Sequence, residues 1–278
     1  AITMGDPNGI GPEILAKALS AHALGTYCRP VVFGDKTVLE QAGEGRPGMP
    51  PCHAISDLNE MDTDNGVIPV FQAGCASPPL RPGTIDPETS HCAAVWIESA
   101  ARLALAGRLQ ALVTCPVSKE GLLRSGCPHA GHTPMLQAIT GVEQCHMSLF
   151  HERLRIVHIT AHLSMRDAVA AVRKDRILHA IEAGYHTLRR LGFAAPRLAV
   201  SGLNPHAGEN GAFGREEIEE IAPAAVLARS RGIDCAGPFA PDTVFNRMYG
   251  GEFDLVVAMY HDQGHIPFKM LAFDTGVN

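Results

Sequence analysis

Three apolar runs in the second half of the chain, each followed by a histidine, constrain its fold most strongly. The runs cover residues 154–160, 198–203 and 254–260, and they lead to His162, His206 and His261. Apolar, β-branched runs of this length, bounded by Gly, Pro and Asn, are typical of strands buried on both faces of a sheet. In open α/β sheets, ligands bind beyond the carboxyl ends of the strands. The pattern therefore predicts three imidazoles at a ligand-binding edge.

Three imidazoles at such an edge would suit a divalent metal ion that keeps a coordination position open for a substrate. The chain has 14 histidines, so one histidine after a strand would by itself be read as an ordinary solvated residue. Three in equivalent positions favour a metal site. The donor set accepts zinc, cobalt, nickel, manganese or magnesium and does not choose among them.

Strand-like and helix-like segments alternate along nearly the whole chain, which predicts an α/β fold with a largely parallel sheet. Further strands are expected at residues 2–4, 31–33 and 109–114, with weaker ones at 53–55 and 67–71. Helices are expected at residues 13–21, 36–41, 88–105, 118–124, 134–139, 168–191 and 214–231. The stretch 43–84 is rich in Pro, Gly, Asp and Asn, so we expect irregular structure or a crossing between lobes there.

Composition excludes several classes of protein. Charged residues make up 19% of the chain and its formal net charge is −6, which argues against a nucleic-acid-binding surface. No apolar run reaches the roughly 18 residues of a membrane span, and no secretory leader is visible. None of the eight cysteines forms a C-x-x-C pair. We therefore expect small core residues in a reducing cytoplasm rather than a disulfide scaffold, with Cys115 better read as a core residue than as a nucleophile.

Four other segments carry side chains or glycines of chemical interest. Residues 5–13 form a glycine-rich turn before a helix, for which a structural turn is favoured over a phosphate cradle. Thr133 and Pro134 read as the cap and first residue of a helix, which His132 precedes. The glycine-rich loop 204–214 holds His206. Residues 260–269 are the densest polar cluster, in which Asp262 could orient a ligand histidine and Lys269 could bind phosphate or transfer a proton.

These motifs, taken together, resemble one enzyme family along the length of the chain. The matching segments are Met4-Gly5-Asp6-Pro7, Gly9-Ile10-Gly11-Pro12-Glu13, Gly131-His132-Thr133, Gly202 to Glu209, Pro241-Asp242-Thr243 and Ala258 to Gly264. They are similar to those of the 4-hydroxythreonine-4-phosphate dehydrogenase family. The resemblance implies an isocitrate/isopropylmalate dehydrogenase-like fold, with two α/β lobes and a central cleft. Residues 1–278 are then one two-lobed catalytic unit, which looks truncated after Asn278.

The resemblance also implies a reaction and a set of site residues. It implies NAD- or NADP-dependent oxidation of a secondary alcohol in a phosphorylated hydroxy acid, as in pyridoxine biosynthesis, followed by decarboxylation of the β-keto acid. His162, His206 and His261 become the ligands of the divalent metal ion. The substrate-binding residues become His132, Thr133, Lys269 and Asn278, and Lys269 and Asp262 become candidates for proton transfer. The family's further substrate-phosphate arginine would lie beyond Asn278. The partners implied are a small-molecule substrate and a second copy of the chain, with the active site at the homodimer interface.

Four alternatives stay open at this point. Residues 208–211 and 263–267 look more like a second branch of the family, which acts on D-threonate or D-erythronate 4-phosphate. Another relative oxidises the cis-dihydrodiol of terephthalate, although the retained His132-Thr133 pair favours a phosphorylated substrate. The third alternative is a different class of protein, a non-catalytic binder of a metal or small molecule, and the intact histidine triad argues against it. The fourth is a hydrolase that uses Cys115 or the metal. The residues that bind the nicotinamide cofactor are not identified.

Overall fold

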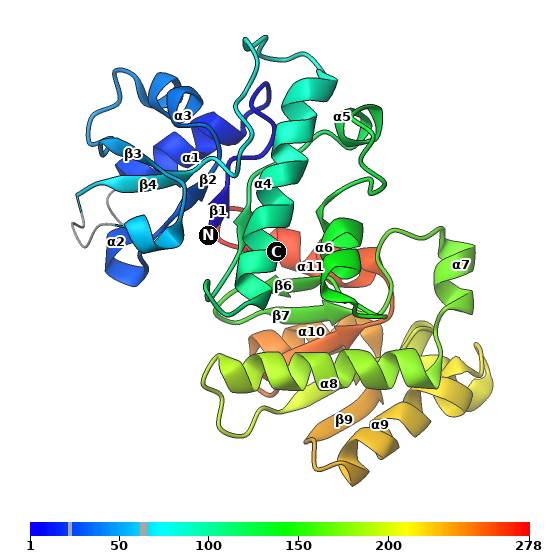
Figure 1. Cartoon of the computed structure of the whole chain (residues 1–278). Helices are drawn as coiled ribbons and strands as arrows, with labels where there is room; N and C mark the ends of the chain where they lie inside the picture. The colour runs from blue at the N-terminus through cyan, green and yellow to red at the C-terminus, as the bar shows by residue number, and fades with distance from the viewer. Residues whose placement is uncertain (22–23, 62–65) are drawn as a thin grey trace. The chain divides into compact units, whose positions relative to one another are not determined.

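The structure is a computed structural model that describes residues 1–21, 24–61 and 66–278. The chain divides into two compact units, Ala1–Glu143 and Gln144–Asn278, which run from blue to green and from green to red in Figure 1. Each is an α/β unit built around its own five-stranded sheet, so the predicted fold class is confirmed at this level. Among the described residues, no helix is long and apolar enough to cross a membrane.

The first unit has a parallel sheet with strand order β3-β4-β2-β1-β5. Its strands are β1 (Ile2–Thr3), β2 (Val32–Phe33), β3 (Cys52–Ile55), β4 (Ile68–Phe71) and β5 (Val113–Thr114). Its helices are α1 (Gly11–Ser20), α2 (Leu24–Tyr27), α3 (Lys36–Gly43), the 3₁₀ turn η1 (Leu58–Glu60), α4 (Pro87–Leu105), α5 (Lys119–Arg124) and α6 (His132–Thr140). The long α4 buries Trp96 completely in the core beside this sheet.

The stretch 43–84 stays within the first unit. The two weak strands expected there form β3 and β4, which pair in parallel and extend the sheet. Irregular structure or a crossing between lobes was expected here; residues 72–86 carry no helix or strand, whereas no crossing falls in the stretch, because the boundary between the units lies after Glu143. Composition misled here because Pro, Gly, Asp and Asn mark turns between short strands as readily as they mark a linker.

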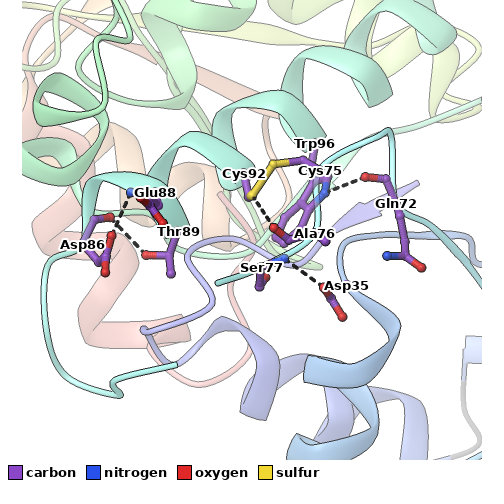
Figure 2. The surroundings of a disulfide bond; sticks show 10 residues. All are labelled: Asp35, Gln72, Cys75, Ala76, Ser77, Asp86, Glu88, Thr89, Cys92 and Trp96. Carbon is purple, nitrogen blue, oxygen red and sulfur yellow. Dashed lines mark hydrogen bonds between the residues drawn. A yellow bond between two sulfur atoms is a disulfide. The ribbon is translucent and has the colours of Figure 1, made fainter. Parts of the chain in front are cut away.

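A disulfide bond joins Cys75 to Cys92 across 17 positions of the sequence, and this corrects the expectation that the cysteines are reduced core residues. Figure 2 shows the bond between the loop after β4 and the first half of α4. The same loop is held to α4 by the Trp96 indole, which donates to the Gln72 carbonyl at 3.0 Å. The pair was missed because neither its spacing nor any local motif marks two cysteines that only the folded chain brings together.

The second unit has the strand order β6-β7-β10-β8-β9. Its strands are β6 (Ser148–Phe150), β7 (Arg155–His158), β8 (Leu198–Ser201), β9 (Cys235–Phe239) and β10 (Leu255–Ala258). Its helices are α7 (Met165–Ala170), α8 (Lys174–Arg190), the short turns η2 (Pro205–Gly211) and η3 (Glu217–Ile221), α9 (Ala222–Ser230), α10 (Pro241–Tyr249) and α11 (His261–Ala272). Every strand pair is parallel except β6 with β7. All residues of β8 and β10 are buried, as expected for strands with both faces covered.

The predicted helix at 168–191 is interrupted, and the interruption has a tertiary cause. Helix α7 ends at Ala170 and α8 begins at Lys174. The backbone N–H of Lys174 donates to the carboxylate of Glu220 at 2.6 Å, so a side chain from a distant turn takes up a free donor at the start of α8. The predicted helix at 214–231 likewise begins late, as the π-helical turn η3 that leads into α9.

Candidate active site

The three strands that precede the selected histidines are neighbours in one sheet. Strand β10 pairs in parallel with β7 on one side and with β8 on the other. His162 follows the carboxyl end of β7, His206 that of β8 and His261 that of β10. The predicted placement of all three histidines beyond one edge of a sheet is therefore confirmed.

Two buried polar side chains fix the ends of these strands. The Thr160 hydroxyl donates to the Met259 carbonyl at 2.9 Å, which ties the segment after β7 to the end of β10. The Gln263 amide oxygen accepts from the Met259 N–H at 2.7 Å, and its amide nitrogen donates to the Gly202 carbonyl at 2.8 Å. Gln263 thus joins the ends of β10 and β8. Sequence reasoning gave it no role, although a glutamine inside the polar cluster was a visible signal.

His261 opens helix α11, and its ring is held from one side. Its Nδ1 lies 2.6 Å from the carboxylate oxygen Oδ1 of Asp262. A carboxylate accepts, so Nδ1 carries the proton. The Nε2 of the neutral ring then has a lone pair with which it can bind a ligand. The role expected for Asp262 as the acceptor that orients a histidine agrees with this contact. The ring centroid of His162 lies 6.2 Å from that of His261.

His206 lies in a turn of unusual backbone geometry. Residues 206–210 all have positive φ between 43° and 81°, and only one of the five is glycine. A left-handed conformation costs an L-residue about 1–2 kcal/mol, so this turn needs support from outside. Buried Glu217 supplies it, because its Oε1 accepts from the N–H groups of Leu203 and Asn204 at 2.8 and 2.7 Å, while its Oε2 accepts from the Asn204 amide at 2.9 Å. Glu217 is a second residue that sequence reasoning missed.

The donor chemistry of the three histidines fits a divalent ion, but their present positions do not complete a site. Only His162 and His261 have a ring contact with each other, and within the described residues no three His, Cys, Asp or Glu side chains gather closely enough to hold a metal. His206 has an exposed side chain on its own turn. The assignment of all three as metal ligands therefore stays a prediction.

Two further imidazoles accompany His261. The His265 ring stacks on His261 with a centroid separation of 3.6 Å and an angle of 10° between the planes. The His158 ring, at the end of β7, lies 4.7 Å from that of His265. Burial lowers the pKa of His158 to about 4, so this imidazole is neutral at pH 7. Neither residue was selected from the sequence, because their relation to His261 exists only in the fold.

The other expected site residues of this unit lie on α11 and after it. Residues 261–269 of the polar cluster form most of this helix, and Tyr260 is its cap. Asp262 and Lys269 are both exposed, and seven positions apart they leave the helix from nearly the same face. Asn278 is exposed at the end of a segment that Val277 attaches to β6 through paired hydrogen bonds with Phe150.

His132 and Thr133 belong to the first unit, where they open helix α6. The cap of this helix is Gly131 and not Thr133, so the predicted cap position is wrong by two residues. Gly131 has φ = 133°, a conformation that L side chains rarely adopt and that glycine accepts freely. The His132 Nε2 is buried without a hydrogen-bond partner among the described residues, and burial lowers the pKa of this imidazole. A buried imidazole nitrogen without a partner is consistent with a ligand-binding role for His132.

Two of the competing interpretations from the sequence lose support. Cys115 is buried, and burial raises the pKa of its thiol, which keeps the sulfur in the less reactive protonated form. In the turn 5–13, a Cβ on Gly5 would come within 2.3 Å of the Pro116 carbonyl oxygen, and one on Gly11 within 2.1 Å of that of Met4. These glycines allow close backbone packing, which supports the structural turn over the phosphate cradle.

Comparison with known proteins places the chain in a family. The family described as "Pyridoxal phosphate biosynthetic protein PdxA" matches residues 26–278. The chain belongs to the PdxA family. It is 45% identical, over its whole length and 82% of the relative, to a 4-hydroxythreonine-4-phosphate dehydrogenase of Desulfosudis oleivorans. It is 42% identical, over its whole length and 84% of the relative, to a D-threonate 4-phosphate dehydrogenase of Cupriavidus necator.

Solved structures agree with this assignment. The crystal structure of a 4-hydroxythreonine-4-phosphate dehydrogenase from Klebsiella pneumoniae has a TM-score of 0.88 and 40% sequence identity, covering 98% of this chain and 82% of that one. This PdxA-family chain is therefore a dehydrogenase, an oxidoreductase that acts on CH–OH groups. The family resemblance recognised from the motifs is confirmed.

Proposed function

We propose that this protein oxidises the secondary alcohol of a phosphorylated hydroxy acid of the 4-hydroxythreonine 4-phosphate type, using NAD or NADP and a divalent metal ion. The β-keto acid formed then loses carbon dioxide. The observation that carries the proposal is the arrangement of His162, His261 and His206 beyond three adjacent parallel strands of one sheet. Ligand sites of α/β sheets lie at such edges, and imidazole nitrogens are suitable ligands for a divalent ion.

Each group in the proposed site has a role that its surroundings support. His162, His206 and His261 would hold the metal ion, and Asp262 keeps the proton of His261 on Nδ1, which leaves the lone pair of Nε2 available to the ion. When bound, the ion supplies Lewis acidity to the substrate oxygens. A bound nicotinamide would supply the hydride acceptor, and the protein's contribution would be to position its ring.

Substrate recognition is proposed for four residues of the chain. His132, Thr133, Lys269 and Asn278 would bind the substrate, and an exposed ammonium such as that of Lys269 suits a phosphate or carboxylate. Lys269 and Asp262 leave one face of α11 and would exchange the proton of the alcohol or of the carbon left by decarboxylation.

The assembly and setting form part of the same proposal. We propose the isocitrate/isopropylmalate dehydrogenase-like arrangement, a homodimer that shares the active site between its subunits, and a cytoplasmic enzyme of pyridoxine biosynthesis. The Cys75–Cys92 disulfide bears on the last point, because stable disulfides are uncommon in a reducing cytoplasm. Measuring the free thiols of protein purified from cells under alkylating conditions tests whether this pair is oxidised there.

D-Threonate 4-phosphate is the second candidate substrate, since one relative at 42% identity carries that activity in its name. The deciding experiment compares 4-hydroxythreonine 4-phosphate, D-threonate 4-phosphate, D-erythronate 4-phosphate and a terephthalate cis-dihydrodiol, each with NAD and NADP, with and without added divalent metal. Metal-dependent appearance of reduced nicotinamide with a phosphorylated substrate supports the proposal. No reduction with any of the four, in a folded protein, contradicts it and favours a non-catalytic binder.

A ligand variant tests the metal assignment separately. We expect His206→Ala to lower kcat by at least about a hundredfold with saturating metal, because removing a direct ligand costs more than the 10–100-fold typical of its supporting partners. The matched control is His53→Ala, which removes an exposed imidazole from β3 in the first unit. Circular dichroism should be unchanged in both variants. Activity near that of wild type in His206→Ala would remove His206 from the metal site.

A further inference from the structure

The strongest ring contact in the second unit involves a residue with no assigned role. His265 lies one helical turn after His261 on α11, and the two imidazoles are stacked almost in parallel, with their centroids 3.6 Å apart and 10° between their planes. His261 is about one-third exposed by side chain, whereas His265 is buried. The buried His265 ring therefore covers one face of the more exposed His261 ring.

The inner ring is itself fixed by a hydrogen bond. The Nδ1 of His265 lies 3.0 Å from the backbone carbonyl oxygen of His261. A carbonyl can only accept, so Nδ1 carries the proton of His265. This bond sets the plane of the His265 ring relative to the backbone from which the His261 side chain departs.

A third imidazole, that of His158, lies close to the His265 ring. The ring of His158 lies 4.7 Å from that of His265 and 6.3 Å from that of His261. Its Nδ1 is 3.2 Å from the Met147 carbonyl, so its orientation is fixed by the backbone beside β6. A Cβ at position 264 would come within 2.3 Å of its Nε2, so only glycine leaves room for His158 there. The three rings form a row that runs from a buried strand end to the surface.

The outer ring then has two restraints. Asp262 holds the His261 Nδ1 at 2.6 Å but is itself exposed on the first turn of α11, with 67% of its side chain accessible. An exposed carboxylate has rotational freedom and competes with water for its partner. The stacked face of His265 restrains the ring plane without that freedom. Together the two contacts define the direction of the His261 Nε2.

We propose that His265 is a positioning residue that stacks on His261 and fixes the direction in which His261 presents Nε2 to the active site. This inference rests on the proposed function, which makes the His261 Nε2 a metal ligand. The stacking of the two rings does not depend on that function. A buried residue with only a packing role would fill the space beneath α11 without controlling the tautomer or the ring orientation of His261.

The test compares two substitutions of His265. His265→Phe keeps a flat ring for stacking and loses the Nδ1 donor, whereas His265→Leu removes both. The matched control is His179→Leu, which breaks an imidazole pair of this unit that does not include His261, the 2.8 Å contact between His179 and His146. Circular dichroism checks folding, and if His265→Leu does not fold, His265→Gln takes its place as the variant without a ring.

The first measurement needs neither metal nor substrate. Proteins labelled with ¹⁵N-histidine are compared at pH 8 by long-range ¹H–¹⁵N spectra, with the His261 signals assigned by their loss in His261→Gln. We expect wild type, His265→Phe and His179→Leu to show one tautomer of His261, protonated at Nδ1. In His265→Leu we expect averaged ¹⁵N shifts for His261, because the His261 ring is then free to rotate and both of its tautomers are populated.

The second measurement is titration with Co²⁺ alone, followed by visible absorption. Stacked aromatic pairs contribute enough free energy that we expect about threefold to tenfold weaker Co²⁺ binding in His265→Leu, with His265→Phe close to wild type. Unchanged His261 signals in folded His265→Leu overturn the inference, and so does a His265→Phe protein that behaves like His265→Leu. If the wild-type protein oxidises none of the candidate substrates, the proposed function is contradicted. The ¹H–¹⁵N spectra of the variants still decide this inference.

Discussion

Replacing Glu217 with Ala should destabilise the turn that carries His206 more than any surface substitution nearby. The Glu217 side chain is 3% exposed, and its carboxylate accepts three hydrogen bonds, two from the N–H groups of Leu203 and Asn204 and one from the Asn204 amide. Each hydrogen bond to a charged acceptor contributes about 1.5–3 kcal/mol. Water entering the vacated space recovers part of the loss, so we expect the free energy of unfolding to fall by about 3–5 kcal/mol.

Glu217→Gln separates the parts of this effect. A glutamine can keep the oxygen that accepts from the two backbone N–H groups, but its amide then faces the donor of Asn204. We therefore expect a smaller loss, about 1–2 kcal/mol. The control is Glu219→Ala, which removes only an exposed pair with Arg215 at 2.6 Å and should cost less than about 0.5 kcal/mol.

Urea unfolding followed by circular dichroism measures these differences. A loss below about 1 kcal/mol for Glu217→Ala would refute the reasoning, because the partly buried N–H groups of Leu203 and Asn204 would both lose the oxygen that accepts from them. Equal losses for Ala and Gln would refute the assignment of the two backbone bonds to one oxygen. A large loss for Glu219→Ala would show that charge in this segment, and not the hydrogen bonds, stabilises the turn.

Three further predictions concern packing, pH and the disulfide. Gly264→Ala should lower the free energy of unfolding by roughly 1–3 kcal/mol in urea, because its Cβ would lie 2.3 Å from a buried imidazole, whereas Gly25→Ala, with open space around it, should be neutral or stabilising. Burial lowers the pKa of His146 from 6.5 to about 4. The contribution of His146 to the free energy of unfolding is therefore full above pH 6.5 and is lost as the pH falls towards 4, with a slope of at most about 1.4 kcal/mol per pH unit. We expect His146→Gln to flatten this pH dependence in urea unfolding. Reduction of the Cys75–Cys92 bond, which closes a 17-residue separation, should cost about 3 kcal/mol in thermal or urea unfolding, and Cys75→Ser should be insensitive to reductant.

Most of the strands could be predicted from the sequence because the signal for a buried strand is local. The apolar runs before His162, His206 and His261 became β7, β8 and β10, and their shared parallel direction put the three histidines at one edge. Most of the helices were predicted in place but not in extent, and α2, α10 and α11 were not predicted. Their ends depend on partners such as Glu220, whose carboxylate lies at the start of α8 although it is 46 positions away in the sequence.

The parts of the site that were missed depend on contacts between distant segments. No helix was predicted over α11, because its first turns carry His, Asp, Gln and Gly and it contains Pro267, all of which weaken a helical pattern. Gln263 and Glu217 were passed over because a buried polar side chain is recognised by its partners, and the sequence does not name them.

The sequence alone determined the class of fold, the family and the strand ends that the three histidines follow. It could do so because hydrophobic periodicity and motifs are properties of consecutive residues. The tertiary structure decided how each histidine is presented. It put His206 on a left-handed turn supported by a buried carboxylate, and it stacked His261 on His265 above a neutral His158. These orientations follow from hydrogen bonds and ring contacts across the fold. Their energies exist only once distant segments exclude water from between them.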